Sequence, residues 1–163
     1  MLYSWGAGYH GQLGLEAKRK KCEMIPVQIN FNEAVIQISC GGFHTGLLTE
    51  QGKVYTWGDG EKGQLGNLDA KDRMHATPHL VEDLDTKWIA AGATATSCVT
   101  VEGEMWLWGF GESFHPKGTS NIVYKPVKVK HFVDKGETVV QVGIGQSHIV
   151  VLTEGGDVWA FGK

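Results

Sequence analysis

The chain has 163 residues, with 15 basic and 18 acidic side chains and a formal net charge of −3. This balance predicts no general attraction to nucleic acid, because such binding neutralises several phosphates at once. The three cysteines, Cys22, Cys40 and Cys98, lack paired spacing, and neither a secretory signal nor an apolar stretch of membrane-spanning length is visible. These features favour an intracellular protein, cytoplasmic or nuclear, without a disulfide framework or a membrane contact.

The predicted elements are short strands. The chain opens with an apolar strand at residues 2–5 and a glycine-rich turn, and a complete unit begins at residue 35. In that unit residues 35–39 alternate apolar and polar, residues 45–49 follow, and Gly52 supplies a tight hairpin turn before residues 54–57. A last strand near residues 78–81 carries Pro78 near its start, as an edge strand does.

The same order of elements returns along the chain. The equivalent aromatic residues Trp5, Trp57, Trp108 and Phe161 are separated by 52, 51 and 53 residues. Four-stranded units at a fixed period, with strands that are apolar on both faces, predict the blades of a β-propeller. We therefore expect an all-β chain that forms one partial propeller domain, residues 1–163, with repeat units at about 2–52, 53–103 and 104–156 and an extra strand at 157–162.

Two segments carry a specific motif, WGAGYHGQLG at residues 5–14 and WGDGEKGQLG at residues 57–66, the second preceded by CGGFHT at residues 40–45. This motif resembles the repeat of the regulator of chromosome condensation family. The resemblance implies a propeller of seven four-stranded antiparallel blades, of which this chain supplies about three. It also marks as structural repeat positions Trp5, Gly6, Gly8, His44, Trp57, Gly58, Gly60, Trp108, Gly109, Gly111 and His148.

Two copies depart from this pattern. The third copy, which begins at Trp108, has lost Gly-Gln-Leu-Gly, and the second copy has Ala95 where His44 and His148 stand. Because three repeats cannot close a ring of seven blades, we expect further blades in the same chain, or self-association, to cover the open ends.

Several local patterns resemble ligand-binding or metal-binding motifs but also have a structural interpretation within the repeat. Residues 6–11 and 58–63 match the G-x-G-x-x-G dinucleotide pattern, which requires a following helix, so we interpret these glycines as turn residues. His75 and His79 have the spacing of a metal pair on a helix, but Pro78 argues against a helix and predicts loop residues. His44 and His148 stand at equivalent positions of the repeat and would lie two blades apart, too far to bind one metal ion. We therefore expect each imidazole to form a hydrogen bond to backbone within its own blade. We predict no metal and no cofactor.

Two further patterns allow more than one interpretation. Lys18, Arg19, Lys20 and Lys21 form a basic run that fits a nuclear-import signal or, more simply, a solvated loop. The aromatic pairs on the third strand of each unit could stack on bases, but their regular recurrence indicates core packing. Ser147 and His148 are neighbours on a strand and point to opposite faces, so they form no nucleophile–base pair.

We predict a non-catalytic platform whose loops bind another protein. Phe114 and His115 replace turn residues in the irregular third copy and would be exposed for contact with a partner, although ordinary loop drift is the simpler interpretation. The candidate contact residues are Tyr9, His10, Glu61, Lys62, Glu112, Ser113, Phe114 and His115.

The resemblance also implies other roles. The type member of the family accelerates nucleotide release from a Ran-like small GTPase, using one propeller face and an inserted β-wedge, and no insertion of that size is visible here. A third context is a partner-binding module in a HECT-type ubiquitin ligase or a kinase, where catalysis lies in another domain.

Overall fold

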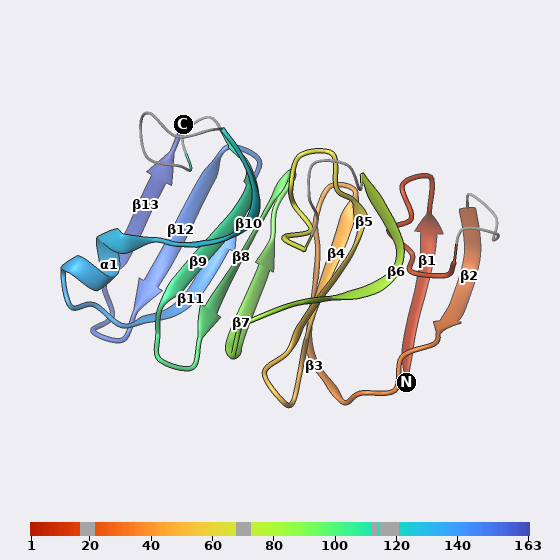
Figure 1. Cartoon of the computed structure of the whole chain (residues 1–163), viewed down its shortest axis with the longest axis horizontal. Helices are drawn as coiled ribbons and strands as arrows, with labels where there is room; N and C mark the ends of the chain where they lie inside the picture. The colour runs from red at the N-terminus through yellow and green to blue at the C-terminus, as the bar shows by residue number, and fades with distance from the viewer. Residues whose placement is uncertain (17–21, 68–72, 112–113, 115–120) are drawn as a thin grey trace.

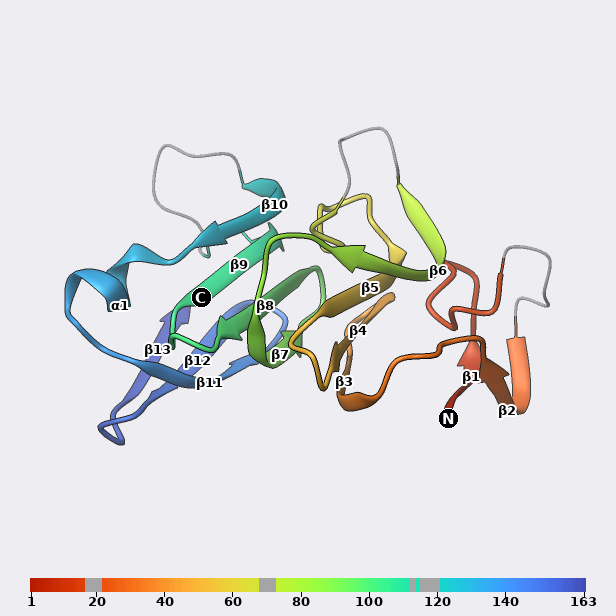
Figure 2. The same ribbon diagram turned by 60° about the horizontal axis from the view of Figure 1, so that its bottom comes forward.

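The strands of the computed structural model form four antiparallel sheets that stand side by side in chain order (Figures 1 and 2). The structure describes residues 1–16, 22–67, 73–111, 114 and 121–163. We number the sheets from the N-terminus. The first contains β1 (Leu2–Ala7) and β2 (Cys22–Ile29), and the second β3 (Val35–Cys40), β4 (His44–Thr49), β5 (Val54–Asp59) and β6 (Met74–Val81). The third contains β7 (Thr86–Ala91), β8 (Ala95–Thr100), β9 (Met105–Phe110) and β10 (Ile122–Lys128), and the fourth β11 (Val139–Ile144), β12 (His148–Thr153) and β13 (Val158–Gly162).

The all-β class and the four-stranded antiparallel blades are confirmed. Strand order within the second and third sheets follows chain order, with hairpins from the first strand of the sheet to the last. The predicted hairpin glycine Gly52 has a φ of +77°, and its equivalents in the next two copies, Gly103 and Gly156, have +83° and +87°, the conformation that glycine adopts without steric cost. Each sequence repeat unit therefore covers the last strands of one sheet and the first strands of the next.

A bulge with a proline occurs in the last strand of each complete sheet. The pairing of β5 with β6 shifts between Thr56 and Gly58, and the stretch of β6 that contains Pro78 lies opposite Trp57. The prediction that Pro78 lies near the start of its strand was wrong, because β6 begins at Met74. Proline cannot donate to a ladder, and the bulge accommodates it inside the strand.

One short helix, α1 (Lys130–Asp134), occurs among the described residues and was not predicted. It lies in the connection from β10 to β11, residues 129–138, which is longer than the equivalent connections at 30–34 and 82–85. Five residues are too few to show a helical period in the sequence. The helix buries Phe132, which is 2% exposed, against the third and fourth sheets.

Candidate partner-binding face

The first two interfaces between sheets are closed by the same pair of hydrogen bonds. At the first interface the carbonyl oxygen of Gln12 accepts from Thr45 Oγ1 at 2.9 Å and from Trp57 Nε1 at 2.8 Å. At the second, the carbonyl oxygen of Gln64 accepts from Thr96 Oγ1 at 2.7 Å and from Trp108 Nε1 at 2.9 Å. The donors lie directly opposite each other on neighbouring strands of one sheet. The Gly-Gln-Leu-Gly motif thus presents a backbone acceptor to the next sheet.

The glycine that ends the motif is required by this contact. Gly14 and Gly66 both have φ of +70°, and a Cβ at either position would lie 2.9 or 2.5 Å from the indole nitrogen of Trp57 or Trp108. A side chain there would therefore push the indole away from its acceptor. The leucines of the motif, Leu13 and Leu65, are buried beside it.

His44 extends the hydrogen bonds of the second interface. Its Nε2 lies 2.8 Å from Thr96 Oγ1, whose own proton is donated to Gln64, so His44 must be the donor in this pair. Burial lowers the pKa of His44 to about 4, against an opposing effect of the Asp59 charge, so the imidazole is neutral at pH 7. The prediction of a backbone partner within the same blade was wrong, because the partner is a side chain of the next sheet.

The third interface has none of these groups. Ala95 stands in place of His44, and Ile149 and Phe161, which lie opposite each other on β12 and β13, replace the threonine and the tryptophan. All three pack in one apolar cluster with Phe114. Ala95 of the second copy and Phe114 of the third copy, where the repeat pattern is lost, therefore meet at this interface.

Phe114 was predicted to be exposed, and this was wrong. It is 8% exposed, and its N–H donates to Gly111 O at 3.2 Å, as Gly63 N–H donates to Gly60 O at 3.0 Å in the regular copy. The turn is kept while the ring folds inward, so closely that a Cβ on Gly111 would lie 2.1 Å from it. Apolar burial outweighs exposure at this turn because the neighbouring interface is itself apolar.

The other structural repeat positions differ by their place in the row of sheets. Trp57 is 1% exposed and Trp108 is fully buried, whereas Trp5 is 60% exposed because no sheet of this chain precedes it. His148 is exposed for the corresponding reason, since no sheet of this chain follows the fourth. The positive φ after each tryptophan is +104° at Gly6, +108° at Gly58 and +101° at Gly109, and Gly8 O accepts the turn hydrogen bond of the first copy.

Exposed aromatic and apolar side chains gather at one end of the first two sheets, on two turns and at the start of β6. The His10 ring lies 4.5 Å from the Phe43 ring, and Met74 packs beside Gly11. Phe43 is 52% exposed and Met74 49% exposed. With Tyr9, which is 62% exposed, these residues form what we call the aromatic loop patch: Tyr9, His10, Phe43 and Met74.

The backbone that carries this patch is fixed. Asp59 N–H donates to Phe43 O at 2.9 Å, and Gly42 N–H donates to Gly92 O of the third sheet at 3.1 Å. Sequence reasoning identified Tyr9 and His10 but missed Phe43 and Met74. The available signal was a phenylalanine directly after Gly41 and Gly42, at a turn where burial is rare.

Of the other predicted contact residues, Glu61 and Lys62 lie on the turn after β5. Glu61 is exposed and pairs with Arg73 at 3.9 Å, and Lys62 Nζ lies 5.5 Å from the centre of the Phe110 ring. Glu112, Ser113, His115 and the basic run Lys18, Arg19, Lys20 and Lys21 lie outside the described residues.

No metal site emerges from the part of the chain that the structure describes. Its histidines, cysteines and acids form no group of three that could hold a metal ion. His75 and His79, predicted as loop residues, instead lie on β6 with their rings stacked 4.3 Å apart at 9°. Residues 6–16 and 58–67, which contain the G-x-G-x-x-G patterns, hold turns and no helix. Within the described ranges no helix is long and apolar enough to cross a membrane.

The chain is similar to proteins of several kinds. It is 34% identical over 160 residues to the RCC1 domain-containing protein RUG3, mitochondrial, of Arabidopsis thaliana, which covers 93% of this chain and 36% of that protein. It is 33% identical to the Homo sapiens regulator of chromosome condensation, over 99% of this chain and 38% of that protein. It is also 32% identical to the human E3 ubiquitin-protein ligase HERC2, of which it spans 3%. The chain thus spans little more than a third of the first relative.

Solved structures share the arrangement of the sheets. Human WBSCR16 matches 98% of this chain and 42% of its own, with a TM-score of 0.86 and 24% identity. Prp20p of Saccharomyces cerevisiae matches 99% of this chain and 41% of its own, with a TM-score of 0.80 and 25% identity. The model of the regulator of chromosome condensation (RCC1) repeat matches residues 1–48 and 51–99, and a second model of the repeat matches 35–64 and 139–163. The chain belongs to the regulator of chromosome condensation repeat family.

Proposed function

We propose that this chain is a non-catalytic protein-interaction platform and that its aromatic loop patch contacts the partner. The observation that carries the proposal is the exposed cluster of Tyr9, His10 and Phe43, on two turns held by backbone hydrogen bonds, with Met74 at the start of β6. Aromatic residues and methionine are enriched at protein–protein interfaces. A fixed backbone also reduces the entropy lost on binding.

Two solved structures of one relative suggest which proteins to test. One structure of Prp20p is described together with its binding to Gsp1p and histones, and another shows the yeast protein bound to Kap60. The experiment measures binding of the purified chain to a small GTPase of the Gsp1p type, to histones and to a Kap60-type receptor by interferometry. We expect the double substitution Tyr9→Ser and Phe43→Ser to weaken binding to the true partner by about tenfold or more.

A matched control keeps the test specific. Gln51 is exposed in the turn between β4 and β5, at the opposite end of the sheet from the patch, so Gln51→Ala should leave binding unchanged. Equal loss in both variants, or none in the double variant, would contradict the assignment of the patch as the contact surface.

A second candidate is exchange activity toward a Ran-like small GTPase. The 33% identity to the human regulator of chromosome condensation favours it, although this chain spans 38% of that protein. The test is release of a labelled guanine nucleotide from the GTPase. Binding without faster release supports the platform, whereas a stoichiometric increase in the release rate would assign exchange to this chain.

The similarity to HERC2 supports a third context, in which the platform serves a ligase or a kinase whose catalytic domain lies elsewhere. In any of these contexts, further blades or a second copy would cover the open face of the first sheet, where Tyr3 and Trp5 are exposed. An intracellular location remains part of the proposal.

A further inference from the structure

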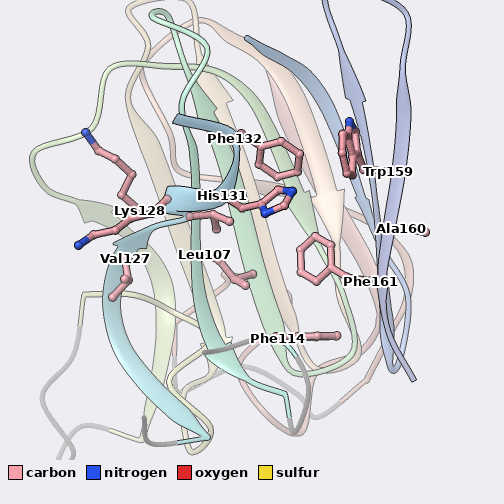
Figure 3. Close-up of a pocket in the computed structure, with 11 residues that line it drawn as sticks. Leu107, Phe114, Val127, Lys128, His131, Phe132, Trp159, Ala160 and Phe161 are labelled. Carbon is pink, nitrogen blue, oxygen red and sulfur yellow. The ribbon is translucent and has the colours of Figure 1, made fainter. Parts of the chain in front are cut away.

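Two strands, β1 and β13, lack a neighbour that the equivalent strand β5 has, among the described residues. β1 pairs only with β2, whereas β5 has β4 on one side and β6 on the other. β13 pairs only with β12 and borders an apolar groove of about 600 Å³, with Phe132, Trp159 and Phe161 around the space (Figure 3). The strands at the place next to β13 in other sheets, β6 and β10, share only a proline, so the repeat specifies no occupant there. At β1 the repeat does specify one.

The first interface between sheets lacks a histidine that the second has. At the second, His44 Nε2 donates to Thr96 Oγ1 at 2.8 Å. At the first, Thr45 is the equivalent of Thr96 and its hydroxyl donates to backbone in the same way, so its oxygen can accept from a histidine. His44 lies opposite Gly58 on β5, so the missing histidine would lie opposite Gly6, on a strand beside β1.

The exposure of one isoleucine marks the same missing strand. Ile89 of β7 is 1% exposed and packs against Gly46 of β4, where a Cβ would lie 2.7 Å from Ile89 Cδ1. Ile38 holds the equivalent position on β3 and is 57% exposed. Because Gly46 lies opposite Thr56 on β5, the residue that would cover Ile38 lies opposite Ser4 of β1 and must be small.

A further strand would continue this contact. The Gln37 side chain of β3 holds β7 by two hydrogen bonds, from its Nε2 to Ile89 O at 2.9 Å and from Ile89 N–H to its Oε1 at 3.0 Å. Ser39 Oγ of the same strand accepts from Ala91 N–H at 2.8 Å. Ile38, the equivalent of Ile89, receives no such side-chain hydrogen bond from the described residues. The missing element is therefore a hairpin of two strands.

We propose that the free edge of β1 takes up a β-hairpin of the same repeat type from outside residues 1–163, with histidine and glycine two residues apart on its second strand. Its histidine donates to Thr45, and its glycine lies against Ile38. Strand addition supplies main-chain hydrogen bonds, and these two side-chain positions supply specificity. The hairpin continues the interface that Gln12 already forms with the second sheet.

A second copy of this chain does not supply that hairpin. Its hairpin with His44 and Gly46 is already part of a four-stranded sheet. The hairpin of its open last sheet has His148 followed two residues later by Val150, and the valine side chain would occupy the place of the glycine. The inference is independent of the aromatic loop patch and of the proposed partner-binding function.

The test measures binding of labelled synthetic hairpins to the whole chain by fluorescence anisotropy. The probe has the sequence of residues 35–49 with Cys40→Ser, which prevents oxidation. The matched probe is residues 139–153, which has the same length and an equivalent histidine but valine in place of the glycine. We expect saturable binding of one 35–49 peptide per chain, and binding of the 139–153 peptide that is weaker by about tenfold or more. Light scattering checks that both peptides are monomeric.

Two substitutions in the chain place the site. Ile38→Asp should weaken binding of the 35–49 peptide by about tenfold or more, because the hairpin would bury an unpaired carboxylate. Ile36→Asp is the matched control. Ile36 is 61% exposed on the same strand, and its equivalent Lys87 stays exposed although the second sheet covers β7, so binding should be unchanged. Both side chains are exposed, so both variants should fold, as thermal melting checks.

A double-mutant cycle tests the histidine contact. His44→Ala in the peptide should weaken binding to the natural chain about three- to tenfold. The same change should matter much less with the Thr45→Val chain, which has no hydroxyl to accept the hydrogen bond. This variant keeps the hydrogen bond from Trp57 Nε1 to Gln12 O at the first interface.

Four results would overturn the proposal. The first is no saturable binding of the 35–49 peptide, and the second is equal binding of both peptides. The third is an equal effect of Ile38→Asp and Ile36→Asp, which would mean that the peptide binds elsewhere. The fourth is an equal loss from the peptide change His44→Ala with the natural chain and with Thr45→Val, which would remove the histidine from the contact.

Discussion

The second and third interfaces between sheets occupy equivalent places in the repeat and have opposite chemistry. At the second interface His44 donates a hydrogen bond to Thr96, and Thr96 and Trp108 both donate to the carbonyl oxygen of Gln64. At the third, alanine, isoleucine and phenylalanine occupy the equivalent positions, and Phe114 packs in the same apolar cluster. The polar groups of the repeat therefore act as one set. A buried donor or acceptor that loses its partner costs more free energy than replacement of the whole set by apolar groups.

The largest expected effect is at Trp108. Trp108→Ala removes a fully buried indole and its hydrogen bond at the second interface, and we expect a loss of about 3–5 kcal/mol in the free energy of unfolding. Trp5→Ala changes the equivalent residue where it is 60% exposed and should cost far less, about 0.5 kcal/mol. Urea denaturation of both variants measures this, and similar midpoints would break the distinction between covered and open sheets.

The next largest effect is a dependence of the free energy of unfolding on pH. It comes from His44 at the second interface, whereas the third interface has Ala95 at the equivalent position. The pKa of His44 is about 4 in the folded chain and about 6.5 in the unfolded chain, so the unfolded chain binds more protons between these values. The contribution of His44 is complete above about pH 6.5 and falls by about 3 kcal/mol as the pH drops to 4, below which the loss no longer grows.

His44→Gln tests this, because the amide can donate to Thr96 and does not titrate. Urea midpoints at pH 7 and pH 5 should differ more in the natural chain than in the variant. An equal acid sensitivity in both would mean that other groups account for it. His148→Gln, at the exposed equivalent position, is the control and should leave the pH dependence unchanged.

A smaller loss of stability is expected at Thr96. Variants at this position test most directly whether the polar groups act together. Thr96→Val leaves His44 Nε2 without its acceptor and removes one donor from Gln64 O, which should cost about 1–3 kcal/mol. The triple variant His44→Ala, Thr96→Ile and Trp108→Phe reproduces the chemistry of the third interface. Its loss should be smaller than the sum of the three single losses, measured by denaturation as a mutant cycle. Simple additivity would show that the three residues act independently.

The smallest effect concerns charge on the loop face. Arg73 and Glu61 form an ion pair at 3.9 Å, with side chains that are 74% and 59% exposed. Arg73→Ala should change the free energy of unfolding by about 0.5 kcal/mol or less, because solvent screens such pairs. A loss of several times that amount in thermal and urea denaturation would mean that the loop is coupled to the interface below it.

The predictable part of the fold follows from local pattern. Strand positions, the hairpin glycines and the period near 51 residues all came from the alternation of apolar residues and from turn chemistry, both of which act over a few residues. The bulge around Pro78 and the helix at 130–134 could not be predicted from local pattern. The bulge depends on the partner strand, and the helix is too short to show a period. The motif also identified the family before any contact was known.

The sequence alone is sufficient to predict the all-β repeat and its period. Which residues meet depends on how the sheets pack. Phe114 lies in one copy, Ala95 in another and Phe161 near the end of the chain, yet they pack at one interface. Likewise the partner of His44 is 52 residues away, in the next sheet. A sequence repeat does not state where one sheet ends and the next begins, because burial and hydrogen bonding between sheets join residues a full period apart.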